Sequence, residues 1–230
     1  MSVAADLRFV SEHLVDTQAL RRAGASERDV RRALHTGALT RLRPGWYARA
    51  PFWSVARPEV RHLAAILAAH RTANSPPVFS HLSAAAIHGW PAWSTWLHPS
   101  GTASPEPDPR TAHATVTPRQ RASSSDSLVR HRSRLDEADI ASLAPFRCTG
   151  PERTVTDLAR TQPFEVALSS ADAHLRTITR VGRKSTTAHC AHGGKTHTSG
   201  RTGCARVQAA EPRAPSLHSL TRSLTPPWKA

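Results

Sequence analysis

The sequence predicts an α+β protein in which short helices alternate with short strands. Three observations lead to this prediction. Apolar residues recur at helical spacing beside capping residues over positions 6–37. The next stretch, 39–49, contains Leu, Trp and Tyr and is divided by Pro44-Gly45, a strong turn signal. Between 58 and 184, helix starts alternate with short strand-like runs. The predicted order is therefore a helical segment with a hairpin, and then a small mixed domain.

Charge is the strongest feature of the composition. The 230 residues carry a formal net charge of +14, and Lys occurs only at 184, 195 and 229, so Arg dominates. A basic excess favours a polyanionic partner, nucleic acid before membrane. Arg also suits phosphate and guanine, because its planar fork forms two parallel hydrogen bonds. Coding bias in a GC-rich genome explains the Arg-to-Lys ratio equally well, so the positions of the arginines must carry the functional argument.

The sequence predicts a protein of the cytoplasm. The N-terminus lacks the basic and apolar regions of a signal peptide, and no apolar run reaches membrane-spanning length. Three Cys residues in a chain this long do not form a disulfide framework.

Three helices are expected before residue 37. The first covers Asp6 to Leu14. Asp16 caps the second, Thr17 to Ala23, and Gly24 ends it in the left-handed position. Ser26 opens the third helix in a capping box with Asp29, and Gly37 closes it.

The third helix has one basic face. At about 100° per residue, Arg28, Arg31, Arg32 and His35 share roughly one third of its circumference, and Val30, Ala33 and Leu34 lie opposite. Two helices joined by a short Gly-containing turn, the second of them basic, are typical of a helix-turn-helix. The hairpin that follows is its expected wing. We therefore predict that residues 1–50 form a winged helix-turn-helix that contacts DNA through Ser26, Arg28, Arg31, Arg32, His35, Arg41, Arg43 and Arg49.

The segment TQALRRAGASERDVRRALHTGALTRLRPGWYA resembles the N-terminal domain of AbiEi-type antitoxins. FSHLSAAAIHGW (79–90), HATVTPRQR (113–121), LVRHRSRLDEADI (128–140) and CTGPERTVTDLAR (148–160) follow in that family's order, so the resemblance covers about residues 10–180. It implies a repressor that binds the operator of its own operon. It also implies a second domain that antagonises a nucleotidyltransferase-like toxin.

The predicted second domain, 58–184, is a small mixed α/β domain. Its expected helices are Pro58 to Ala73, Ser83 to His88, one that starts at Pro151 under a Thr149 cap, and Phe164 to Thr177. Its expected strands are Val78 to Ser80, Ala112 to Thr117, Leu128 to His131 and Pro145 to Cys148. Arg153 and Asp157 are expected to form an i, i+4 ion pair, and Arg130, His131, Arg132 and Arg134 a basic cluster.

The sequence predicts no catalytic residues, no cofactor and no metal site. Ser80, His81 and Ser83 have no local acid partner and are interpreted as residues of a helix start, with capping roles. Longer AbiEi relatives can carry a nuclease-like domain, but no Glu-x-Lys occurs here. Two alternatives to the repressor stay open: an antitoxin that binds only protein, and a truncated remnant of a nuclease-like family member.

Residues 185–230 are predicted to be a disordered, low-complexity basic tail. They contain a single acid, Glu211, and no Ile, Phe or Tyr, so they supply little core. We hypothesise that this segment is a frameshifted reading of a longer family member; sequencing the locus would test that. The alternative is a zinc site from His189, Cys190, His192, His197 and Cys204, whose order and spacing depart from those of a zinc finger.

Overall fold

The computed structural model describes residues 3–91, 108–118 and 123–190, with side chains up to residue 179. The chain divides into two units, Met1–Ala188 and His189–Ala230, and nearly all described residues belong to the first. That unit is a mixed α+β structure with two sheets, as the sequence predicted.

The N-terminal part of the unit contains a three-stranded antiparallel sheet and three helices. Helix α1 (Val3–His13) leads into β1 (Leu14–Asp16), followed by α2 (Thr17–Arg22) and α3 (Glu27–His35). Strands β2 (Leu39–Arg43) and β3 (Trp46–Arg49) then form a hairpin, and β1 pairs with β3 to give the order β1-β3-β2. The register places Val15 opposite Tyr47 and Thr40 opposite Ala48.

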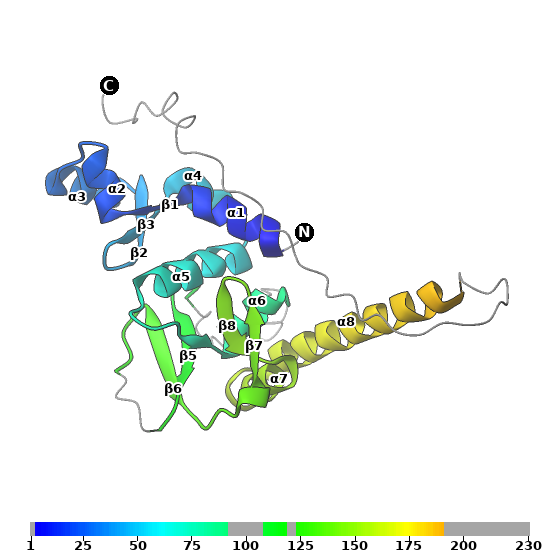
Figure 1. Cartoon of the computed structure of the whole chain (residues 1–230). Coiled ribbons are helices and arrows are strands. Elements are labelled where there is room, and N and C mark those ends of the chain that lie inside the picture. The colour runs from blue at the N-terminus through cyan, green and yellow to red at the C-terminus, as the bar shows by residue number, and fades with distance from the viewer. Residues whose placement is uncertain (1–2, 92–107, 119–122, 191–230) are drawn as a thin grey trace, which may run out of the picture. The chain divides into compact units, whose positions relative to one another are not determined.

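Helix α5 (Pro58–Thr72) joins the two sheets. It follows the short helix α4 (Ala50–Val55) and begins at a proline, whose missing N–H costs nothing in the first turn. One hydrophobic core runs from Val10 and Leu42 through Leu63 and Ile66 of α5 to Phe79 and Phe146 of the second sheet. In Figure 1, α5 accordingly lies between α1 and β2 on one side and β5 and β6 on the other.

The second sheet is mixed and has the order β6-β5-β4-β8-β7. Its strands are β4 (Val78–Phe79), β5 (Ala112–Val116), β6 (Leu128–Arg132), β7 (Ile140–Leu143) and β8 (Phe146–Thr149), with a 3-10 turn η2 (Glu137–Asp139) before β7. β4 runs antiparallel to β5 and parallel to β8, and β5 and β6 are parallel. Three helices accompany this sheet: α6 (His81–His88), α7 (Pro151–Thr161) and α8 (Phe164–Cys190).

Several elements differ from the sequence-based expectations. Strands β1 and β7 and helix α4 were not predicted from the sequence. Helix α7 is capped by Gly150 and not by Thr149, because the Thr149 hydroxyl lies 2.7 Å from the Thr154 hydroxyl instead. Helix α8 continues to Cys190, well past the expected end at Thr177. No proline interrupts it, and a lone Gly182 costs a helix only about 1 kcal/mol.

The predicted tail is therefore helical in its first residues, 185–190. The rest of it, 191–230, lies outside the described residues, as does most of the alternative zinc site. Within the described ranges, no helix has the length and apolar content that a bilayer crossing requires.

Candidate nucleic-acid interface

Local hydrogen bonds fix the two helices at the candidate site. Asp16 Oδ1 accepts from the Ala19 N–H at 2.6 Å and caps α2, and Gly24 follows that helix at φ +83°. At α3, Ser26 Oγ accepts from the Asp29 N–H at 3.2 Å, and Asp29 Oδ2 accepts from the Ser26 N–H at 2.9 Å. The predicted capping box is confirmed. These contacts satisfy backbone donors that the first turn leaves free, so the start of α3 is set by sequence-local chemistry.

Helix α3 packs through the face that the sequence predicted. Val30, Ala33 and Leu34 lie against a small core made of Leu20, Ala25, Leu39 and Tyr47. Arg28, Arg31, Arg32 and His35 are all exposed, as is Ser26. The helix therefore presents a basic face to solvent, and the small core beneath it fixes its orientation.

The hairpin lies beside this helix. Gly45 adopts φ +81° in the turn, and its carbonyl accepts from the Thr17 N–H at 2.9 Å, which attaches the hairpin to the start of α2. A register irregularity falls between Arg41 and Arg43 on β2. Arg41 is exposed, and Arg43 and Arg49 are half-buried. Only Arg41 of the three hairpin arginines thus extends the exposed face of α3.

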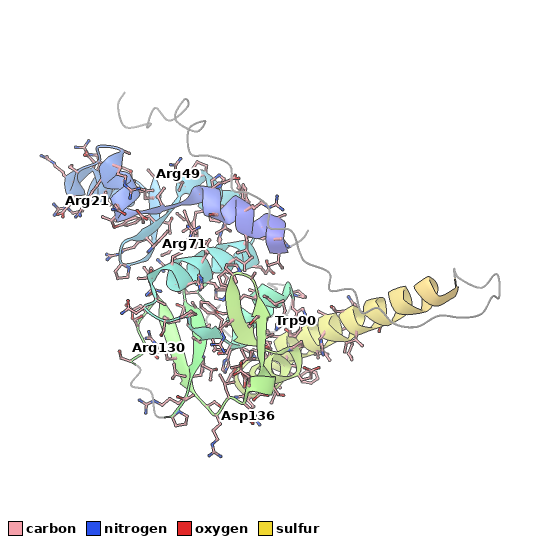
Figure 2. The ribbon with its side chains drawn as sticks, in the orientation of Figure 1. Arg21, Arg49, Arg71, Trp90, Arg130 and Asp136 are labelled. Atoms are coloured by element: carbon pink, nitrogen blue, oxygen red, sulfur yellow. The ribbon has the colours of Figure 1, made fainter. Side chains whose placement is uncertain are left out.

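A cavity of about 300 Å³ connects the two helices with the hairpin. Arg21 of α2, Arg31 of α3 and Arg41 of β2 share its wall. The sequence analysis did not include Arg21 among the site residues, although its position in the last turn of a predicted helix beside Arg22 was visible. We call the exposed set Arg21, Arg28, Arg31, Arg32, His35 and Arg41 the α3–hairpin surface. In Figure 2, Arg21 is labelled beside helices α2 and α3.

The two acids of α3, Glu27 and Asp29, do little to neutralise the surface. Glu27 lies 3.7 Å from Arg21, with both side chains largely exposed. Asp29 is used by the cap. Its pKa is lowered, first by the hydrogen bonds from the side chain and backbone of Ser26, and to a smaller extent by the charges of Arg32 and Arg28. The surface keeps a strong positive excess, which is the electrostatic property expected where phosphates bind.

Arg43 has an environment that the sequence did not reveal. Its Nε and Nη1 atoms are buried and have no hydrogen-bond partner among the described residues. Burial lowers the pKa of this guanidinium, and the charge of Arg130 on β6 lowers it further. Arg43 therefore lies close enough to β6 to be affected by the charge of Arg130, and the predicted phosphate contact from it stays a prediction.

The motif around Ser80 and Ser83 forms a buried hydrogen-bond chain. His62 of α5, which the sequence analysis did not single out, lies 2.9 Å from Ser83 Oγ through Nε2 and 3.0 Å from the Pro109 carbonyl through Nδ1. A carbonyl only accepts, so in neutral His62 the proton is on Nδ1 and Ser83 donates to Nε2. Ser83 Oγ in turn accepts from the His113 N–H at 2.8 Å.

This Ser–His pair differs from an activated nucleophile. Ser83 is fully buried, and burial together with His113 lowers the pKa of His62 to about 3. A general base works best with a pKa near the operating pH. Ser80 occupies the N-cap position of α6, but its side chain makes no capping bond and lies 2.9 Å from His81 Nδ1 instead.

Three further imidazoles gather beside that chain. His81 adopts φ 53° at the start of α6 and stacks on His131, with ring centroids 3.6 Å apart, and His113 Nδ1 lies 3.1 Å from His131 Nε2. Burial, first, and neighbouring charges lower the pKa of His81 and His113 to about 3. His131 thus belongs to this group and not to the predicted basic cluster with Arg130, Arg132 and Arg134. We call His62, His81, His113 and His131 the histidine cluster.

The described ranges contain no group of three His, Cys, Asp or Glu side chains arranged to hold a metal ion. Neither a protein-family model nor a curated protein sequence matches this chain.

Proposed function

We propose that this protein binds duplex DNA through a winged helix-turn-helix made of α2, α3 and the β2–β3 hairpin, and represses its own operon. The observation that carries the proposal is the exposed basic face of α3. It is fixed on one side by a small core and at its start by a capping box. A capped helix with exposed arginines near its N-terminus has the form of a recognition helix, which enters the major groove.

In this proposal the residues of the α3–hairpin surface have two roles. Arg28, Arg31 and Arg32 lie in or near the major groove, where Arg pairs with guanine O6 and N7. Ser26, at the helix start, and His35 lie beside them. Arg21 and Arg41 of that surface contact phosphates, and the half-buried Arg49, which lies outside the surface as defined, does the same. Such contacts position the protein without reading sequence. The mechanism is stoichiometric occupancy of DNA, with no chemical step, cofactor or metal.

A gel shift of the full chain on the DNA upstream of its own gene tests this proposal. We expect a specific complex that weakens as salt rises, because each neutralised phosphate makes the slope of log affinity against log salt more negative by about 0.9. Arg28→Ala with Arg32→Ala should lower specific affinity about 10- to 100-fold.

The matched control is Arg132→Ala with Arg134→Ala. It removes the same charge from exposed side chains at the second sheet, outside the proposed interface. It should leave specific affinity within about twofold. Equal losses of affinity in the two double variants would mean that only the net charge of the protein drives binding. The absence of a shift above that with competitor DNA would contradict the proposal.

We also propose that the second part of the chain binds a partner protein along α8. Five apolar side chains recur at helical spacing on this helix, and four of them, Phe164, Leu168, Leu175 and Ile178, are more than half exposed; the fifth is Ala171. Adjacent exposed apolar residues of this size are typical of an interaction surface. The AbiEi-like motifs imply that the partner is a nucleotidyltransferase-like toxin, which would make this chain an antitoxin.

Co-purification from the source cell tests this second proposal. A nucleotidyltransferase-like protein, identified by mass spectrometry, should be retained by the wild type and lost with Leu168→Glu plus Leu175→Glu. The control substitutes Arg176→Glu and Thr177→Glu, which are exposed residues of the same helix outside the apolar stripe. Retention by the Leu variant, or no such protein with the wild type, would contradict the proposal.

A further inference from the structure

A cavity of about 560 Å³ lies where the β2–β3 hairpin meets the second sheet. One wall is the hairpin segment 41–44. The other is formed by Asp108 and Arg110, which precede β5, and by residues 125–127, which precede β6. This volume is within the range of small-molecule pockets. The cavity therefore has room for a ligand of nucleotide size, and Arg41 is the one residue that it shares with the α3–hairpin surface.

Arg43 supplies unsatisfied hydrogen-bond donors in this wall. Its buried Nε and Nη1 atoms have no acceptor within the described structure. Arg130 of β6 faces it with a like charge and does not stabilise it. A partly desolvated cation without an anionic partner is unfavourable, so this site has a strong requirement for negative charge.

The other charges of the wall leave that requirement unmet. Asp108 is already engaged by Arg110, with Oδ2 2.7 Å from Nη2 and 3.0 Å from Nε. Asp126 is the one other acid among the described residues that line the cavity, and its single negative charge is fewer than the two positive charges of Arg41 and Arg43. Ser125 and Ser127 add hydroxyl groups. Two arginines and hydroxyl groups around one concave space match a phosphate, which carries more charge and more acceptor oxygens than a carboxylate.

We propose that this cavity binds a small phosphorylated ligand of nucleotide size, whose phosphate is held by Arg43 and Arg41. This ligand site is inferred from the cavity and from Arg43 and does not depend on the proposed DNA binding. Arg41 belongs both to this cavity and to the α3–hairpin surface. A ligand that engages Arg41 therefore competes with a DNA phosphate, and by linkage DNA weakens the ligand to the same extent.

Thermal unfolding of the full chain, without DNA, tests the site. The probes are inorganic phosphate, pyrophosphate and ADP, compared with sodium chloride at equal ionic strength. At a hundredfold excess over Kd we expect at least one probe to raise Tm by about 5–10 °C in a saturable manner. No saturable rise with any of them would overturn the proposal.

Two variants assign the effect to the cavity. Arg43→Met should have a Tm equal to or above that of the wild type without a probe, because it removes the unpartnered charge, and should lose the probe-induced rise. A merely structural Arg43 would instead lower Tm. Arg41→Gln, at an exposed position, should fold normally and bind about tenfold more weakly. Arg132→Gln is the matched control and should respond like the wild type.

A second experiment, with duplex DNA, distinguishes a small phosphorylated ligand from a DNA backbone phosphate as the occupant of the cavity. If DNA binding falls in Arg43→Met while every small probe leaves the wild-type Tm unchanged, the occupant is a backbone phosphate and the small-ligand proposal is wrong. If the probes raise Tm and the rise is lost in Arg43→Met, the proposal holds even where the gel shift fails.

Discussion

The α3–hairpin surface and the histidine cluster use ionisable residues in opposite ways. On the surface, arginines lie in solvent with few acids near them, so they keep their charge and their freedom to meet a partner. In the cluster, imidazoles are packed between α5, α6, β5 and β6 and are held neutral by burial. The net charge of a chain therefore says little by itself. Placement decides whether a charge serves binding or must be suppressed for folding.

The arginines of the two parts show the same contrast. Arg28 and Arg32 are exposed on α3. Arg153 of α7 is 15% exposed and contacts Asp157 at 2.9 Å and Asp139 at 3.0 Å. It also donates to the Arg134 carbonyl and the Ser133 hydroxyl. Burial alone would lower its pKa, but the hydrogen bonds and charges of the two carboxylates outweigh burial and raise it. The predicted Arg153–Asp157 ion pair is confirmed and extends to a second acid.

The largest effect is expected from breaking that network. Arg153→Ala leaves Asp157 buried without its cation, and Asp157 Oδ2 already lacks a hydrogen-bond partner in the part of the chain that the structure describes. Removing one member of a buried pair costs about 3–5 kcal/mol of unfolding free energy. Urea unfolding of the variant measures it. Arg28→Ala is the control from the other part and should stay within about 0.5 kcal/mol of the wild type. If Arg153→Ala and Arg28→Ala lowered the unfolding free energy equally, the proposed contrast between the buried and the exposed arginine would be wrong.

The second effect is acid sensitivity of the histidine cluster. The folded pKa of His62 is about 3, below the ordinary value of 6.5, because of burial and the charge of His113. The unfolded chain therefore binds the proton first. The stability that neutral His62 contributes is therefore fully present above about pH 6.5, the unfolded pKa, and is lost as pH falls toward the folded pKa of about 3. At about pH 5 the loss is about 2 kcal/mol for this one group, at 1.36 kcal/mol per pKa unit.

Urea unfolding at about pH 7.5 and about pH 5 checks this expectation. In His62→Gln, the stability difference between the two pH values should shrink by about 2 kcal/mol relative to the wild type. His35→Gln changes an exposed histidine of the α3–hairpin surface and should leave that difference unchanged. If both variants keep the wild-type pH dependence, His62 is not the group that the fold holds neutral.

Sequence reasoning succeeded where the structure is local. The Asp16 cap, the Ser26–Asp29 box and the Pro44-Gly45 turn each depend on residues within a few positions, so their chemistry is visible in the sequence. The basic and apolar faces of α3 follow from helical spacing alone.

It failed where distant segments meet. His62 contacts Ser83 and Pro109, which are 21 and 47 residues away, and no spacing rule pairs them. Arg43 and Arg41 are the same residue type two positions apart, and nothing in the sequence indicated that Arg43 would be partly buried beside the charge of Arg130. Strands β1 and β7 are three and four residues long, and each is defined by its pairing with β3 or β8 more than by its own composition.

The smallest effect is expected from removing the Ser26 cap, which tests whether the cap helps to hold the basic face of α3 in position. Ser26→Ala removes the hydroxyl that accepts from the Asp29 N–H and leaves a first-turn donor without a partner. We expect a loss of about 1 kcal/mol in unfolding free energy, the usual cost of deleting an N-cap side chain. Ser26→Asp restores an acceptor and should recover much of that loss. Ser54→Ala, at an exposed serine of α4 that caps no helix, is the control and should cost less. Because the arginines stay in place, a loss of stability that equals the control would mean that packing on Leu20 and Leu39 alone orients α3. A full loss would mean that the cap also holds the basic face in position.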